Sequence, residues 1–276
     1  MTHRPQIPVF VVSLARAAER RQAMCAHLDE LGLTFRLIDA VDGRALDPAF
    51  TRAKVAPGVT IHAGAVGRYL SHIQIYQAMV DEGIEAALVL EDDARLSPRA
   101  VPMLTGAFDS AGFDYCFLDS EDHNESGPVF YDRDDAVALA PGFHAHRLSA
   151  GPQTTHAYII GLPAARRRLE HAFPIRQPID LYDVLPYPIV FRAVVTPKTA
   201  WVSSDSLSSF TSDRQLAVGT LKLKLLRRSI LFYRVKDFVQ MKWWQRRRLA
   251  KAWAREGRLD ASKTWLPLPS GRQVVL

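Results

Sequence analysis

Cysteine is scarce in this chain, whose 276 residues include only Cys25 and Cys116. Two cysteines without a C-x-x-C spacing build neither a disulfide framework nor a cysteine-ligated metal site, and they fit a reducing compartment. The fold must therefore depend on its apolar core, which a hydrophobic content of 48% can supply.

Long apolar runs are absent as well. The run near the start, Ile7–Leu14, is less than half of the roughly 20 residues that span a bilayer, and charged residues follow it closely. We therefore expect a buried strand there, and neither a transmembrane helix nor a signal peptide. The corresponding expectation for the location is the cytoplasm.

The net charge of +6 is unevenly distributed along the chain. Thirteen Lys or Arg and two acids give residues 221–258 a charge of +11, which leaves −5 for the rest. An acidic body suits a small ligand, whereas a basic segment suits an anionic surface. Since this segment has no recognisable readout motif, we expect no nucleic-acid partner.

Residues 211–276 are predicted to form a basic helical tail after a single domain at 1–210. Apolar residues recur in this tail at helical spacing: Leu221, Leu225, Phe232, Val235, Val239 and Trp243. A basic helix with such a stripe can lie on an anionic membrane, which predicts a peripheral position on the inner membrane face. Alternatively, the stripe packs on the preceding domain while the cations stay in water.

The opening of the chain predicts an α/β fold. A continuous β-favouring run at Ile7–Leu14 precedes a helical segment at Arg16–Leu31, with Gly32 as its stop, and a second strand at Thr34–Ile38. The order strand, helix, strand is typical of a mainly parallel nucleotide-binding sheet flanked by helices.

A second helix–strand pair follows. Apolar residues at helical spacing predict a helix over Gly64–Asp81, and Ala86–Leu90 is an uninterrupted apolar strand. The remaining expected elements are a helix at Pro98–Phe108, a strand at Tyr115–Leu118, an acidic loop at Ser120–Asp135, strands at Thr155–Ile160 and Ile189–Val195, and a helix at Ala164–His171.

Three acids, Glu91, Asp92 and Asp93, directly follow the strand at Ala86–Leu90. Ligands of open α/β sheets bind at the carboxyl edge of the strands. Adjacent carboxylates repel one another, and a hard divalent ion such as Mg²⁺ or Mn²⁺ would offset that repulsion and share its shell with substrate phosphates. The alternative is a strand end capped by solvated acids.

Seven segments with recognisable residues follow one another in a fixed order. They are Val11-Val12-Ser13-Leu14 with Arg16 and Glu19-Arg20, Asp39–Gly43, Gly64–Gly67 leading to Leu70-Ser71-His72, Leu88–Ala94, Thr155–Ile160, Ala164-Ala165, and Pro178-Ile179-Asp180. This ordered set, over about residues 7 to 205, resembles glycosyltransferase family 25, the lipooligosaccharide and collagen galactosyltransferase group.

The resemblance implies a GT-A-like nucleotide-sugar-binding fold and an inverting, metal-dependent transfer. The residues that it implies are Glu91 and Asp93 as ligands of Mn²⁺ or Mg²⁺, and Ser13, Leu14, Arg20 and Asp92 as donor-binding residues. The implied donor is a nucleotide sugar, by default UDP-galactose. The implied acceptor is a saccharide of a lipooligosaccharide or another cell-surface glycan, free or lipid-linked. The alternative is a non-catalytic protein that keeps the fold and binds a saccharide or a nucleotide sugar.

An inverting transfer needs a base for the acceptor hydroxyl, and Asp180 at the family's Pro-x-Asp position is the candidate. The alternative for Asp180 is a helix N-cap. Asp183, Asp119 and Glu121 are competing carboxylates, the first two as acceptor-side candidates. The acidic loop is either a lid over the substrate or a solvated loop.

Two histidines are also candidates. His156 precedes a strand and is an acceptor-side candidate, with a structural histidine as the alternative. His72 lies at the edge of the apolar face of its helix, where it either packs in the core or lines a pocket.

Overall fold

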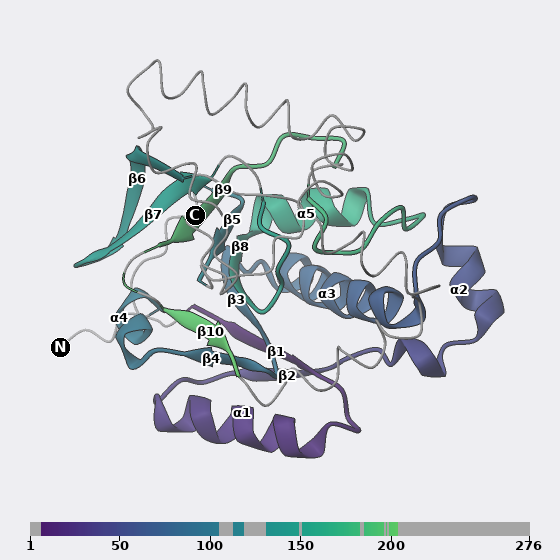
Figure 1. Ribbon diagram of the computed structural model, residues 1–276, viewed down its shortest axis with the longest axis horizontal. Helices are drawn as coiled ribbons and strands as arrows, with labels where there is room; N and C mark the ends of the chain where they lie inside the picture. Colours follow the sequence, from purple (N-terminus) through teal and green to yellow (C-terminus); the bar gives the residue numbers. More distant parts are fainter. Residues whose placement is uncertain are drawn as a thin grey trace, which may run out of the picture.

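The computed structural model describes residues 7–104, 113–118, 131–148, 151–182, 185–195, 197 and 199–203. It is a mixed α/β structure built around an eight-stranded sheet (Figure 1). The elements of its first half are β1 (Val9–Ser13), α1 (Ala18–Glu30), β2 (Arg36–Asp39), a 3₁₀ turn η1 (Gly43–Ala45), α2 (Pro48–Lys54), α3 (Ala63–Glu82) and β3 (Ala86–Glu91). Those of its second half are β4 (Ala94–Leu96), a 3₁₀ turn η2 (Pro98–Ala100), α4 (Val101–Leu104), β5 (Tyr115–Phe117), β6 (Tyr131–Ala140), β7 (Phe143–Leu148), β8 (Ala157–Gly161), α5 (Leu162–Glu170), β9 (Phe191–Val194) and β10 (Ala200–Val202).

The strand order in the sheet is β2-β1-β3-β8-β5-β9-β7-β6. Six of these strands run in one direction, and only β8 and β7 run against them. The predicted mainly parallel α/β sheet is therefore confirmed. β10 and β4 form a separate antiparallel pair.

Two apolar layers cover the two faces of the sheet. Along β1, Phe10 and Val12 belong to the cluster under α3 and α5, whereas Val9 and Val11 belong to the cluster that includes α1 and α4 (Figure 1). Because both faces are covered, β1 has no polar alternation and is buried at all five positions.

Glycines end the two long helices, and Gly32 is the stop that the sequence predicts for the first of them. Gly32 follows α1 with a φ of 66°, and Gly83 caps α3 with a φ of 67° in the left-handed region, which favours glycine. The predicted strand–helix–strand opening and the predicted helix before β3 are thus confirmed, with small shifts at their ends.

The predicted acidic loop at Ser120–Asp135 is wrong for its last five residues, which begin strand β6. The carboxylate of Asp132 is fully buried and accepts the backbone N–H groups of Asp134 and Asp135, at 3.0 and 3.3 Å. These contacts lie at a register shift in the pairing of β6 with β7, so the carboxylate of Asp132 stabilises an irregular part of the strand. The other residues of that segment, 120–130, lie outside the described part, as does any lid that they form.

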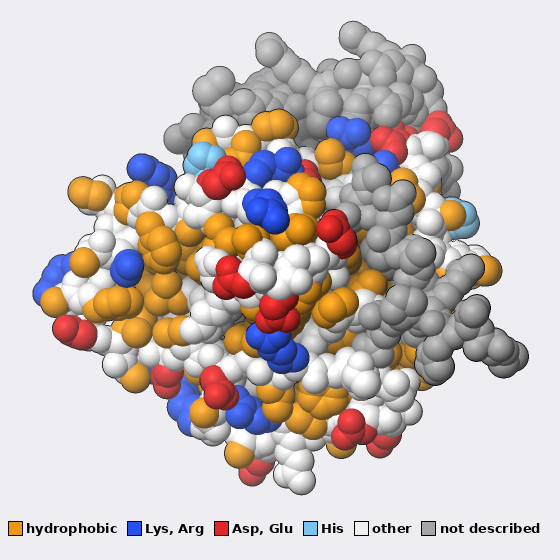
Figure 2. Space-filling view, turned by 180° about the vertical axis from the view of Figure 1, so that it is seen from behind, with side chains coloured by type: hydrophobic (Ala, Val, Ile, Leu, Met, Phe, Trp, Pro, Cys, Tyr) orange, Lys and Arg blue, Asp and Glu red, His pale blue; other side chains and the backbone are white. Residues whose placement is uncertain are grey.

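The helix expected at Pro98–Phe108 is present as η2 and α4 up to Leu104, and the following residues lie outside the described part. Residues 204–276 also lie outside it, so the domain boundary at 210 and the basic helical tail stay predictions. No helix of the described ranges is both long and apolar enough to cross a membrane. Acidic and basic side chains are interspersed with apolar ones over the face seen in Figure 2.

Candidate functional site

The ends of β1, β2 and β3 meet at one edge of the sheet. Ser13 of β1 pairs with Asp39 of β2, and Val12 of β1 pairs with Glu91 of β3. Glu91 closes β3, and Asp92 and Asp93 form the turn before β4. The three consecutive acids therefore lie where the apolar strand predicts them, at the carboxyl edge of the parallel strands.

Their side chains diverge into three different environments. The Thr155 hydroxyl donates a short hydrogen bond to Oε1 of Glu91. Asp92 contacts residues at the end of β1, and Asp93 contacts His156. Asp92 and Asp93 are only 6% and 5% exposed, so they are not the solvated acids of the alternative interpretation.

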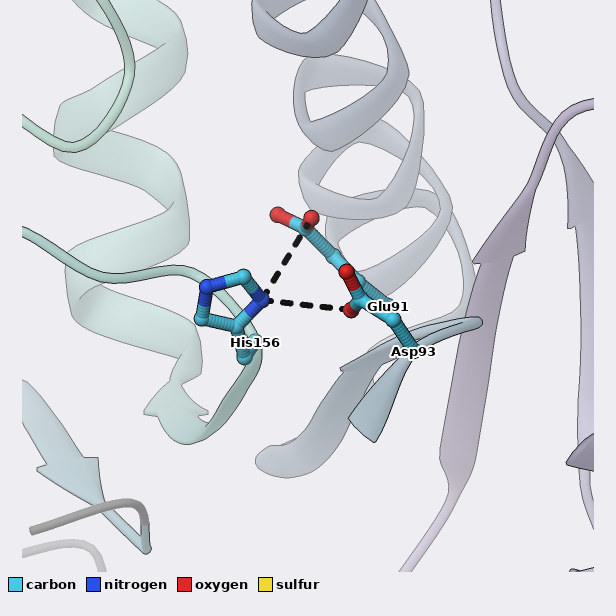
Figure 3. Close-up of side chains that lie close together, drawn as sticks. All are labelled: Glu91, Asp93 and His156. Atoms are coloured by element: carbon cyan, nitrogen blue, oxygen red, sulfur yellow. Dashed lines mark hydrogen bonds and ion pairs between the residues drawn. The ribbon is translucent and has the colours of Figure 1, made fainter. Parts of the chain in front are cut away.

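The ring of His156 faces the carboxylates of both Glu91 and Asp93 (Figure 3). Its Nδ1 is 3.2 Å from Oδ1 of Asp93 and 3.8 Å from Oε2 of Glu91. One ligand atom from each residue lies within 4.8 Å of the other two, so the three residues form a triad that could hold a metal ion. Two carboxylate oxygens and one imidazole nitrogen suit Mn²⁺, whereas Mg²⁺ prefers oxygen ligands alone.

Antiparallel pairing brings His156 to this position. β8 runs against β3, so the start of β8 faces the end of β3, with Ala157 opposite Leu90. The N–H of Glu91 also donates to the carbonyl of His156 at 2.9 Å. His156 was expected on the acceptor side, and the structure places it beside the predicted metal ligands.

The predicted donor-binding residues gather around Asp92. Ser13 donates from Oγ to Oδ2 of Asp92 at 2.7 Å, and Arg20 approaches Oδ1 of Asp92 with its Nη2 at 3.4 Å. Burial raises the pKa of Asp92, although the Ser13 hydrogen bond and the Arg20 charge act against this rise. Leu14 follows β1 directly, and its carbonyl accepts the N–H of Ala17 in the turn that leads into α1.

Glu91 has the opposite electrostatic balance. Burial alone would raise the pKa of Glu91, but the imidazoles of His72 and His156 and the guanidinium of Arg68 outweigh it and hold that pKa well below its usual range. Glu91 is therefore an anion at neutral pH, as a metal ligand must be.

Asp180 lies at the margin of this cluster. Its Oδ2 is 3.6 Å from Nη1 of Arg68, and the same guanidinium acts on Glu91. Asp180 stands in a turn, and the next two residues are not helical, so the alternative that it caps a helix is wrong. The preceding carbonyl, that of Ile179, accepts a hydrogen bond from buried Arg168 at 2.9 Å.

Asp119, Glu121 and Asp183, the other carboxylates weighed for the acceptor side, lie outside the described residues. The sequence does not predict that Thr155, Arg68 and His72 act on Glu91. The sequence gives one signal for two of them, since Thr155 and His72 are polar residues next to strongly apolar runs.

Comparisons with a family profile and with curated proteins point to the same family. The sequence profile of glycosyltransferase family 25 (LPS biosynthesis protein) matches residues 6–182. The chain is 30% identical over 194 residues to "Probable inactive glycosyltransferase 25 family member 3" of Bos taurus, covering 64% of this chain and 31% of the relative. It is 30% identical over 211 residues to "Glycosyltransferase 25 family member" of Aedes aegypti, covering 71% of this chain and 32% of the relative.

A shorter match has the higher identity of 36%, over 97 residues of "Procollagen galactosyltransferase 1" of Danio rerio, covering 32% of this chain and 16% of that protein. The chain thus spans at most about a third of the length of these curated relatives. A solved structure, "Crystal structure of a glycosyltransferase involved in the glycosylation of the major capsid of PBCV-1", aligns with a TM-score of 0.30 and 9% identity over 61% of this chain and 63% of that one.

Proposed function

Because the chain belongs to glycosyltransferase family 25, we propose that it is an inverting, metal-dependent glycosyltransferase that moves a sugar from a nucleotide donor to a saccharide acceptor. The observation that carries this proposal is the triad of Glu91, Asp93 and His156, next to the predicted donor-binding group of Ser13, Arg20 and Asp92. A GT-A-like fold is part of the proposal, and the parallel β1, β2 and β3 support it.

Each group of residues has a separate task. Glu91, Asp93 and His156 would hold Mn²⁺, or less readily Mg²⁺, and the ion would neutralise the charge that develops on the leaving diphosphate. Arg20 and Ser13 fix the orientation of Asp92, which would face the nucleotide part of the donor. These contacts position the donor at the edge of the sheet before the acceptor attacks.

Asp180 is our candidate for the base that takes the proton of the acceptor hydroxyl. Its place at the margin of the triad supports this role, since its Oδ2 lies 3.6 Å from Nη1 of Arg68, whose guanidinium also acts on Glu91. The acceptor hydroxyl would then attack the anomeric carbon on the side opposite the diphosphate.

The proposed donor and acceptor rest on the names of a relative and of the family. UDP-galactose is the default donor, because a relative that matches this chain over 97 residues is named a galactosyltransferase. The description of the family as LPS biosynthesis proteins supports a lipooligosaccharide or another cell-surface glycan as the acceptor. A cytoplasmic enzyme, peripheral on the inner membrane face, would meet a lipid-linked acceptor there.

A thermal-shift panel of nucleotide sugars with Mn²⁺ tests the proposal. A bound ligand stabilises the folded state by mass action, so we expect one nucleotide sugar to raise the melting temperature only with Mn²⁺, and a chelator to abolish the rise. Asp93→Asn should remove the metal-dependent part, whereas Asp29→Asn, an exposed acid on α1, should leave it unchanged. If no nucleotide sugar gives a metal-dependent rise, the proposal is refuted.

A non-catalytic binding protein is the second candidate, because the relative in Bos taurus is named as probably inactive. Such a protein would give the same thermal shifts without turnover. Release of the free nucleotide from the stabilising nucleotide sugar, followed with and without saccharide acceptors, separates the two: product formation excludes the non-catalytic candidate.

A further inference from the structure

Helix α3 carries two adjacent polar side chains, Ser71 and His72, that the proposed chemistry leaves unexplained. Both are fully buried. Ser71 Oγ accepts the N–H of Val41 and donates to the carbonyl of Gly67, each at 2.8 Å, which fastens the loop after β2 to the helix. Because a buried polar side chain costs free energy unless it is hydrogen-bonded, His72 must have a comparable use.

A line of polar groups runs from Glu91 through His72 into the core. Nδ1 of His72 is hydrogen-bonded to the hydroxyl of Tyr158 at 2.7 Å. Nε2 of His72 faces Oε1 of Glu91 at 3.6 Å, which is longer than a hydrogen bond, and it has no hydrogen-bond partner among the described residues. The hydroxyl of Tyr158 is 2.9 Å from the hydroxyl of Tyr76. All three rings are fully buried, and the rings of His72 and Tyr158 are stacked with their centroids 5.8 Å apart.

The carboxylate at one end sets the direction of the hydrogen bonds. A carboxylate 3.6 Å away is faced more favourably by an N–H than by a nitrogen lone pair, so the proton of the His72 ring belongs on Nε2, and Nδ1 accepts from Tyr158. Tyr158 in turn accepts from Tyr76. Burial raises the pKa of Tyr76 to about 12 and that of Tyr158 well above its ordinary value, so both hydroxyls keep their protons in the physiological range.

The two oxygens of Glu91 are used differently. Thr155 and His72 both approach Oε1, whereas Oε2 faces Nδ1 of His156 at 3.8 Å. The inner oxygen is thus held by the protein, and the outer one is directed toward the other two members of the triad. Groups that hold a metal ligand in this way typically change metal affinity by about 10–100-fold when they are removed.

We propose that Tyr76, Tyr158 and His72 form a directed hydrogen-bond chain that fixes His72 in its Nε2–H tautomer. The Nε2–H group then faces Glu91 and positions this carboxylate electrostatically as a metal ligand. His72 and Tyr158 are positioning residues, because neither belongs to the triad. The inference rests on the proposed function, since it assigns Glu91 to a divalent ion.

The test compares Mn²⁺ binding by the full chain and by Tyr158→Phe, using calorimetry with Mn²⁺ alone and with Mn²⁺ plus UDP. Tyr158→Phe removes one hydroxyl and keeps the ring, so we expect Mn²⁺ affinity to fall by about 10–100-fold. Tyr69→Phe is the matched control: Tyr69 is a buried tyrosine of α3 whose hydroxyl donates to the carbonyl of Ala172, outside the chain of hydrogen bonds. It should bind Mn²⁺ as the unmodified protein does.

Histidine ¹⁵N NMR of the metal-free protein gives a second readout that needs no folded variant of Tyr158. We expect the His72 signal, assigned with His72→Gln, to show the Nε2–H form. An Nδ1–H form, or unchanged Mn²⁺ affinity of a folded Tyr158→Phe, refutes the hydrogen-bond chain while the proposed function stands. If the unmodified protein takes up no Mn²⁺ under either condition, both the chain and the metal-dependent function are refuted.

Discussion

His156 and Asp93 approach each other with Nδ1 and Oδ1 3.2 Å apart, although 63 residues separate them in the sequence. The contact exists because an antiparallel strand, β8, lies directly beside β3 in an otherwise mainly parallel sheet. His156, which precedes β8, therefore lies beside Glu91 and Asp93, which stand at the end of β3 and just after it.

Replacing His156 by Ala should weaken Mn²⁺ binding by about tenfold or more, because the loss of a direct ligand costs at least as much as the loss of a supporting group. Calorimetric titration with Mn²⁺ measures the effect. His144→Ala, which removes an exposed histidine of β7, is the control. Equal affinity of His156→Ala and the unmodified protein would exclude His156 as a ligand.

Asp92→Asn should raise the melting temperature at pH 7 and weaken donor binding. The pKa of Asp92 is raised in the folded state, chiefly by burial, so the native protein holds this proton more tightly than the unfolded chain does. The stabilisation from the protonated form is complete below the unfolded pKa of about 4 and is lost as the pH rises through the folded pKa. Melting curves between pH 3.5 and 7 should therefore show the advantage of Asp92→Asn shrinking toward low pH. An advantage that is constant over this range would contradict the assignment.

Asp180→Asn should leave donor binding intact and lower the transfer rate by about 10²–10⁴-fold, which is the usual contribution of a positioned base. Single-turnover transfer assays with saturating donor measure this loss. Asp81→Asn is the control, because the exposed carboxylate of Asp81 accepts a hydrogen bond from Gln77 of the same helix, α3. A decrease of less than tenfold with donor binding preserved would remove Asp180 from the role of base.

Gly67→Ala should destabilise the fold by about 1–3 kcal/mol through overpacking. An added Cβ would lie 2.4 Å from the carbonyl oxygen of Val41 and 2.5 Å from the nitrogen of Gly43. Gly64→Ala on the same helix meets no atom closer than 3.6 Å, and alanine favours helix by up to about 1 kcal/mol over glycine. Urea unfolding of both variants should therefore show a lower free energy of unfolding for Gly67→Ala and an equal or higher one for Gly64→Ala.

Binding to anionic vesicles should depend on the basic tail. Liposome flotation with and without anionic lipid, performed on the full chain and on a chain truncated before Leu221, compares the two. Flotation of the full chain alone, and only with anionic lipid, is expected from a basic amphipathic helix. If both chains float equally, the tail is not the membrane contact.

The first half of the site could be predicted from the sequence because its determinants are local. An apolar strand without polar alternation predicts a buried parallel strand, and the position of Glu91, Asp92 and Asp93 at its end predicts their place at the edge of the sheet. Ser13 and Arg20, expected near the end of β1, do meet Asp92 there.

The second half of the site, which His156 contributes, depends on the direction of β8. The residues of β8 do not encode this direction by themselves. Parallel and antiparallel strands buried on both faces have the same apolar pattern, so the sequence predicts a strand near His156 without predicting that its start faces Glu91. The loop prediction for residues 131–135 is wrong for a related reason. Asp132 accepts backbone N–H groups in the irregular part of β6, and Asp135 pairs with buried Arg192, but in the sequence both look like charges in water.

The close approach of Gly67 to the backbone of Val41 and Gly43 has a consequence for how the loop after β2 can move. Helix α3 and that loop touch without an intervening side chain, and Ser71 hydrogen-bonds to Val41 and to Gly67, so the loop cannot shift along the helix without breaking these contacts. The loop begins after Asp39, at the same edge of the sheet as Glu91, so the helix holds the backbone next to the three acids in one place.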